Sequence, residues 1–107
     1  MYKNIAVSEV LDLGQLVDVR PGQVISRTLV QNEGMSVTLF AFDQNEEISS
    51  HQSEGDALVS ILEGEAQITI GEKLYRVRQG ESIVMPKGIA HALLALSPFK
   101  MILVVSF

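Results

Sequence analysis

The sequence predicts an all-β domain with little helix. Apolar and β-branched residues come in short runs, and turn-forming residues interrupt them about every 8–12 positions, as in an antiparallel sandwich or barrel. With 47% hydrophobic and 20% charged residues, the composition is globular. A jelly-roll barrel of two sheets closes such strands over one core. We therefore expect less than about a tenth of the residues in helices, against a usual ~30–35%.

The first three expected strands are separated by polar turns. The breaks fall at Asn32–Gly34 and at Asp43–Asn45, where Asn, Asp and Gly favour chain reversal. In chain order, the nine expected strands are Gly22–Gln31, Met35–Phe42, Glu47–Ser50, Ala57–Glu63, Glu65–Ile70, Lys73–Arg78, Ser82–Met85, Ala90–Leu96 and Phe99–Phe107.

Alternating hydrophobicity and glycine turns define the middle strands. Ala66, Ile68 and Ile70 alternate with polar residues, so one face of their strand is expected to be buried. Gly64 and Gly71 mark the turns before and after this strand. Three antiparallel strands in succession are therefore expected over residues 57–78.

The last three strands follow from a glycine, a proline and an apolar run. Gly80 permits the positive φ of a turn, and Pro86 ends the SIVM strand because proline has no N–H to donate. Gly88 then lets the chain reverse. The unbroken apolar run Met101–Val105 predicts a strand buried on both faces. Such a strand is expected in mid-sheet or beneath a second subunit.

One short helix is expected near the N-terminus, over Val7–Leu13. Ser8 is the candidate N-cap, and Val10, Leu11 and Leu13 give a partial apolar face.

Length, charge and cysteine content limit the classes of function. At 107 residues the chain is expected to form one domain. The net charge of −5 and the scattered arginines argue against a nucleic-acid partner. The absence of cysteine excludes disulfides and thiol nucleophiles. With neither a signal-peptide pattern nor an apolar run near ~20 residues, we expect a cytoplasmic protein without a membrane partner.

A histidine follows the proline turn at a fixed distance. Gly80, Pro86, Gly88 and His91 have the spacing G-x5-P-x-G-x2-H, which resembles the second sequence motif of the cupin family. The resemblance implies a double-stranded β-helix, or jelly-roll barrel, with His91 on its inner face.

The segment from His51 to Gly71 resembles the first cupin motif, in which an H-x-H pair precedes a glutamate and then a glycine, here Gly64. Counting from His51 places Ser53 at the second histidine and Ala57 at the glutamate. In the second motif, Ala95 stands where the family often has asparagine. The resemblance therefore implies the scaffold, with a degenerate metal-binding motif.

The resemblance covers about residues 40–107 and implies two subunits. In cupins, early strands like those expected within residues 1–39 often pair with, or swap into, a second subunit. We therefore expect a homodimer with a small-molecule ligand. The expected pocket-lining residues are His51, Ser53, Ala57, Val59, Met85, His91 and Ala95.

The two histidines are the only metal ligands that the motifs retain. A tight metal site needs at least three protein ligands. Strict alternation from His51 turns Gln52, Glu54 and Asp56 outward, unless the chain slips at Gly55.

These observations leave two hypotheses of function. The first is a protein that binds a small molecule in its barrel, without a tight catalytic metal. The alternative is an enzyme of dioxygenase, isomerase or decarboxylase type, with Fe, Mn, Ni, Cu or Zn on His51 and His91. Neither the substrate nor catalytic residues can be named from the sequence, since fold does not imply function.

Overall fold

The computed structural model describes residues 1–107, and it confirms the all-β expectation. The strands are β1 (Val24–Gln31), β2 (Met35–Phe42), β3 (Glu47–His51), β4 (Asp56–Glu63), β5 (Glu65–Ile70), β6 (Lys73–Arg78), β7 (Ser82–Met85), β8 (His91–Ala95) and β9 (Phe99–Ser106). The single helical element is a four-residue 3-10 turn, η1 (Leu13–Leu16). No helix is long and apolar enough to cross a membrane.

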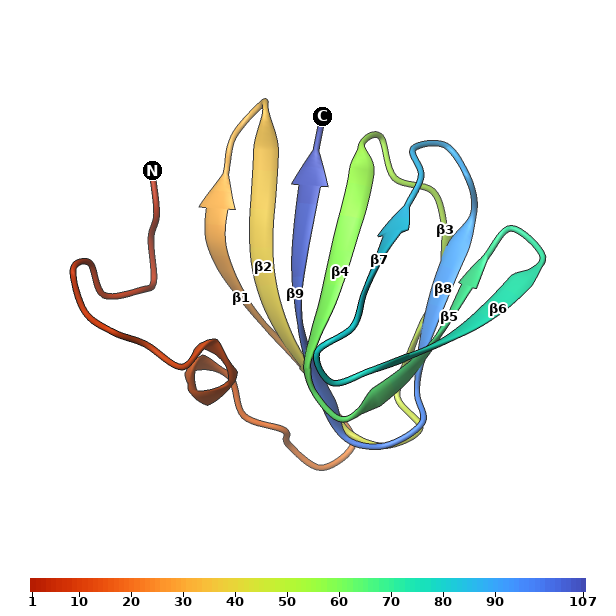
Figure 1. The fold of residues 1–107 in the computed structure, drawn as a ribbon, viewed down its shortest axis with the longest axis horizontal. Coiled ribbons are helices and arrows are strands. Elements are labelled where there is room, and N and C mark those ends of the chain that lie inside the picture. Colours follow the sequence, from red (N-terminus) through yellow and green to blue (C-terminus); the bar gives the residue numbers. More distant parts are fainter.

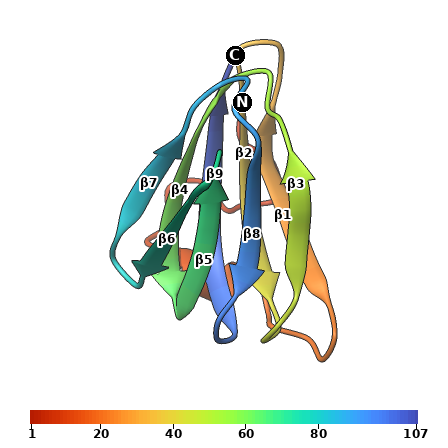
Figure 2. The same ribbon diagram turned by 90° about the vertical axis from the view of Figure 1, so that its right-hand side faces the viewer.

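The nine strands form two antiparallel sheets that face each other (Figure 1). The larger sheet has the order β1-β2-β9-β4-β7, and the smaller has the order β3-β8-β5-β6. Figure 2 shows the four-stranded sheet in front of the five-stranded one. Of the two alternatives for the apolar terminal strand, the structure has the first, because β9 lies in mid-sheet between β2 and β4.

The core between the sheets is built from alternate residues of each strand. Along β4, Ala57, Val59 and Ile61 are buried, whereas Leu58 between them points outward. The two largest fully buried side chains, Phe42 and Phe99, stack with their ring centroids 4.4 Å apart. The other core members are Ala66, Ile68, Val77, Met85, Leu93, Ala95, Met101 and Val105.

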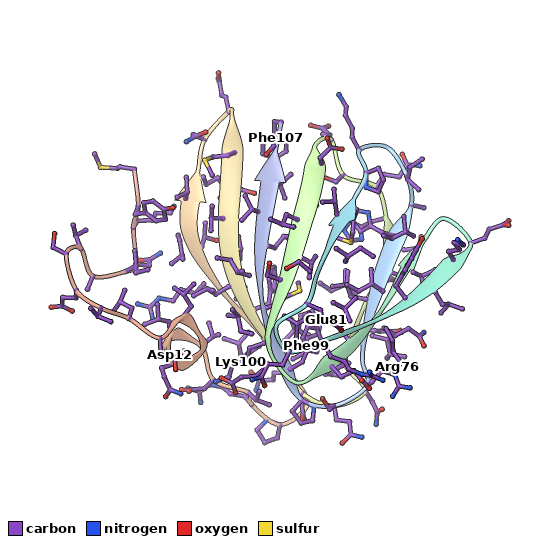
Figure 3. The ribbon with its side chains drawn as sticks, viewed as in Figure 1. Asp12, Arg76, Glu81, Phe99, Lys100 and Phe107 are labelled. Atoms are coloured by element: carbon purple, nitrogen blue, oxygen red, sulfur yellow. The ribbon has the colours of Figure 1, made fainter.

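A second apolar layer covers the outer face of the larger sheet. Its buried members are Val17, Leu29, Val30, Val37, Leu39 and Ala41. The N-terminal segment lies over this layer, and the Arg27 guanidinium holds it by donating to the carbonyls of Asn4 and Leu16. The Lys100 ammonium donates to the Gly14 carbonyl. Lys100 and Phe99 begin β9, at the opposite end of the strand from Phe107 (Figure 3).

The helix expected over Val7–Leu13 is wrong. Ser8 has a φ of 61°, which is left-handed and unsuited to an N-cap. Val7 and Val10 are exposed, and of the expected apolar face only Leu11 and Leu13 are half-buried. The helical turn starts later, where the Asp12 carboxylate accepts a hydrogen bond from Gly14 N.

Strand ends differ from expectation by one or two residues at several places. β1 begins at Val24 because Gly22 has a φ of 68° and belongs to the preceding turn. β3 extends to His51, which pairs with His91, and β8 starts only at His91. Both histidines therefore belong to paired strands.

The stacked ring pair gives a prediction about stability. Replacing Phe42 by alanine should lower the free energy of unfolding by about 3–5 kcal/mol, because it leaves a cavity beside Phe99. Urea denaturation measures this loss. The matched control is Phe107→Ala, whose ring is 58% exposed and which should change stability by less than about 1 kcal/mol. Equal effects from the two substitutions would contradict the assignment of Phe42 to the core.

Candidate functional site

A cavity of about 200 Å³ lies between the two sheets. It is bounded by the end of β3 and the loop after it, together with β4, β7, β8 and β9. The lining residues are Ile48, His51, Gln52, Ser53, Ala57, Met85, His91, Leu93, Met101, Leu103 and Val105.

Two loops hold the polar side of the cavity in place. The turn between β7 and β8 is tied to the loop after β3 by the hydrogen bond from Gly88 N to Ser53 O, 3.0 Å long. Gly88 has a φ of 75°, which a residue with a side chain rarely adopts. On the other side, Gly55 approaches the backbone of Ser106 so closely that a Cβ atom would clash with it. These contacts fix the chain just after His51 and just before His91.

The two imidazoles meet edge to face across the pairing of β3 with β8. Their Nε2 atoms are 3.1 Å apart, and their ring planes make an angle of 69°. The Nδ1 atom of His51 lies 3.0 Å from the Ser49 carbonyl oxygen. The Nδ1 atom of His91 lies 3.2 Å from the Ile89 carbonyl oxygen. Each ring is therefore held by its own backbone, with its Nε2 directed at the other ring.

The two histidines differ in solvent exposure. His91 is only 3% exposed, whereas His51 lies at the surface end of the cavity. Burial lowers the pKa of His91, and a charge on His51 lowers it further, while the Ile89 carbonyl has the opposite effect. His91 is therefore a neutral imidazole at pH 7.

Five of the residues expected on the pocket wall lie there, namely His51, Ser53, Ala57, Met85 and His91. The other two, Val59 and Ala95, are fully buried in the core and do not line the cavity. They share a face with Ala57 and His91 on their strands but lie farther along, where neighbouring core side chains fill the space.

Gln52 lines the cavity, although strict alternation would turn it outward. Alternation fails because the chain leaves the sheet after His51, and the ladder is already irregular between Ile48 and His51. The irregularity therefore precedes the histidine and does not fall at Gly55. The Asp56 carboxylate accepts a hydrogen bond from Lys87 N and does not line the cavity.

Several apolar lining residues were not singled out from the sequence. Met101, Leu103 and Val105 share one face of β9, at a spacing of two. This spacing was visible in the sequence, but the apolar run there is unbroken and gives no sign of which face is inward. The pairing of β9 with β4 determines that face.

The donor set does not match a complete metal site. No group of three or more His, Cys, Asp or Glu side chains is arranged to hold a metal ion. The positions that would complete the set carry Ser53 and Ala57, which offer one hydroxyl and no carboxylate.

The chain resembles known proteins in both sequence and fold. A family model described as the cupin domain matches residues 38–106. No curated protein matches the sequence. A conserved protein of unknown function from Streptococcus pyogenes is 50% identical in sequence, with a TM-score of 0.96; the match covers 98% of this chain and 92% of that one.

Two further solved structures show the same fold. A cupin superfamily protein from Desulfitobacterium hafniense is 30% identical with a TM-score of 0.95, over 100% of this chain and 98% of that one. A cupin 2 conserved barrel domain protein from Leptotrichia buccalis is 33% identical with a TM-score of 0.89, over 91% of this chain and 47% of that one. The family match and these likenesses show that the chain belongs to the cupin superfamily.

Proposed function

We propose that this cupin binds a small organic molecule in the cavity between its sheets. The supporting observation is the division of the cavity wall by polarity. Seven of the eleven lining residues are apolar, and the four polar ones come from the end of β3, the following loop and the start of β8. An apolar pocket with a few convergent polar groups is the usual form of a ligand site.

The volume of the cavity limits the size of the ligand. An apolar cavity of about 150 Å³ is large enough to hold benzene, and drug-sized ligands occupy pockets of about 300–1,000 Å³. At about 200 Å³, the cavity suits a molecule somewhat larger than benzene.

The wall also favours an uncharged ligand. It contains no Asp, Glu, Lys or Arg, and His91 is neutral at pH 7 because burial lowers its pKa. An ion would leave water for a wall without an opposite charge, at a cost of several kcal/mol or more.

A two-ligand metal site is the second candidate, and one distance favours it. Two metal–nitrogen bonds of about 2.0–2.1 Å, meeting at a tetrahedral angle, separate their nitrogens by roughly 3.3 Å. The Nε2 atoms of His51 and His91 are 3.1 Å apart. Because no third protein ligand is present, a metal-dependent enzyme that uses Fe, Mn, Ni, Cu or Zn is less well supported.

A homodimer stays a prediction, and the outer face of the larger sheet now supports it. Leu58 and Val84, which are neighbours on β4 and β7, are 39% and 54% exposed. Val104 of β9 lies on the other side of Leu58. An apolar row on a sheet face suits a partner subunit. A cytoplasmic location and the absence of nucleic-acid partners also stay predictions.

Filling the cavity tests the proposed binding function. We expect a screen of small uncharged aromatic and aliphatic molecules by protein NMR to shift the signals of His51 and His91. Ala57→Leu should abolish these shifts in a folded protein, because the larger side chain takes up cavity volume. The matched control Gln31→Leu adds the same side chain at an exposed position of β1 and should leave binding intact. Binding that survives Ala57→Leu unchanged would place the ligand elsewhere.

Rebuilding the missing ligands tests the metal candidate. The double substitution Ser53→His and Ala57→Glu should add an imidazole and a carboxylate to the wall that holds His51 and His91. We expect at least about tenfold tighter Ni(II) or Co(II) binding than in the wild type, measured by isothermal titration at neutral pH. Adding His51→Ala to the double variant should remove the gain. Tight binding by the wild type itself would favour the metal-dependent enzyme instead.

Disrupting the apolar row tests the dimer. We expect light scattering at micromolar concentration to give twice the monomer mass of 11.7 kDa. Leu58→Glu should shift the protein toward the monomer, because it places a charge in the middle of the row. Leu74→Glu is the matched control, since Leu74 is 64% exposed on β6 of the other sheet. A monomer in the wild type would exclude the dimer.

A further inference from the structure

The polar side of the cavity wall contains one hydroxyl group that the protein already holds in place. Ser53 lines the cavity and is half-buried. Its Oγ accepts a hydrogen bond from Gly55 N, 3.2 Å away, and its carbonyl oxygen accepts one from Gly88 N. Gly55 is itself buried against the backbone of Ser106. The backbone and the hydroxyl of Ser53 are therefore each fixed by a hydrogen bond.

This hydroxyl uses only part of its hydrogen-bonding capacity within the protein. A serine hydroxyl accepts through its oxygen and donates its single proton, which rotates to suit its partner. The Gly55 N–H takes up the oxygen of Ser53 as an acceptor, whereas no protein atom accepts the Ser53 proton. The wall of the cavity therefore presents a hydrogen-bond donor that is fixed in position and still free to bind.

The other polar side chains of the wall are less suited to orient a ligand. The four ring nitrogens of His51 and His91 lie within hydrogen-bond distance of each other or of their own backbone carbonyls. The Gln52 carboxamide is exposed and makes no hydrogen bond within the protein, so a ligand that used it would have to order a flexible side chain. Ser53 avoids that loss of entropy, because Gly55 N already holds its hydroxyl.

We propose that the cavity binds an uncharged carbonyl compound, whose oxygen accepts a hydrogen bond from the Ser53 hydroxyl while its apolar part fills the cavity. This inference rests on the proposed small-molecule function and names the ligand's chemical class and the residue that orients it. A carbonyl oxygen only accepts hydrogen bonds, so the ligand brings no proton that the apolar wall would leave unpaired. That wall includes Leu93, Met101 and Leu103. Cyclohexanone has both features and is somewhat larger than benzene.

Methylenecyclohexane isolates the hydrogen bond, since it has the same ring with a CH2 group in place of the carbonyl oxygen. The two molecules differ in hydration, so the informative quantity is how much a substitution changes the affinity for each of them. We expect Ser53→Ala to weaken cyclohexanone binding at least about fivefold, the effect of losing one neutral hydrogen bond. Methylenecyclohexane binding should stay within about twofold of the wild type. Titration followed by protein NMR measures both affinities.

Two further variants separate the hydroxyl from the shape of the loop. Ser53→Thr keeps a hydroxyl that can both accept from Gly55 N and donate to the ligand, so it should preserve the ratio of the two affinities. Ser50→Ala is the matched control, because Ser50 is exposed on β3 and does not line the cavity, and it should leave both affinities unchanged. A threonine variant that loses the ratio as the alanine variant does would contradict the proposal.

The carbonyl stretching band of bound cyclohexanone provides a measurement that needs no variant. A hydrogen bond to the oxygen weakens the carbonyl bond and lowers its stretching frequency. In the wild-type protein we expect the infrared band of the bound ligand to lie below its position in hexane. A band at the hexane position would overturn the proposal, whether or not Ser53→Ala folds.

The outcomes separate this inference from the function on which it rests. An equal loss of affinity for the two molecules in Ser53→Ala would overturn the hydrogen bond from Ser53 and leave small-molecule binding standing. Failure of both molecules to bind the wild type would contradict the proposed function itself. An effect of Ser53→Ala that disappears when a chelator is added would also overturn the inference, because a metal ion on His51 and His91 would then be what receives the carbonyl oxygen.

Discussion

The two-sided burial of β9 is the constraint on which the rest of the structure depends. Met101 and Val105 face the core between the sheets, while Ile102 and Val104 on the same strand pack into the layer beneath the N-terminal segment. One strand therefore contributes side chains to both apolar layers. Its backbone hydrogen bonds also join β2 and β4 into one sheet. The cavity also depends on it, since part of its apolar wall is the inward face of this strand.

The geometry of the site follows from the pairing of β3 with β8. The β3–β8 ladder brings His51 opposite His91, and the Nδ1 atom of each ring lies within hydrogen-bond distance of a backbone carbonyl oxygen. The two Nε2 atoms are thereby held 3.1 Å apart, each directed at the other ring. A folded, well-packed scaffold thus keeps two imidazoles facing each other at a partly buried site, where a polar contact with a ligand is electrostatically stronger than in water.

The fold could be predicted from the sequence because turn residues and hydrophobic alternation are local signals. Gly80, Pro86 and Gly88 marked a strand, a turn and a second strand, and the structure has them there. The site was harder to predict because it depends on pairing. Alternation alone misplaced Gln52, since nothing local signals the irregularity before His51. The alternation of side chains along each strand correctly placed Val59 and Ala95 on the inward face. It does not show how deep the cavity extends, and both residues belong to the filled core.

The position of β9 also bears on how the protein folds during synthesis. β1, β2 and β4 are synthesised before β9. In the folded sheet β9 lies between β2 and β4 and pairs with both, so these two strands are joined only once β9 is in place. While β9 is still in the ribosome, the edges of β2 and β4 that it will occupy stay unpaired. Such open edges attract other chains. Because sheet pairings of long sequence separation form slowly, the nascent chain passes through an interval in which chaperones that cover strand edges would raise the yield of folded protein.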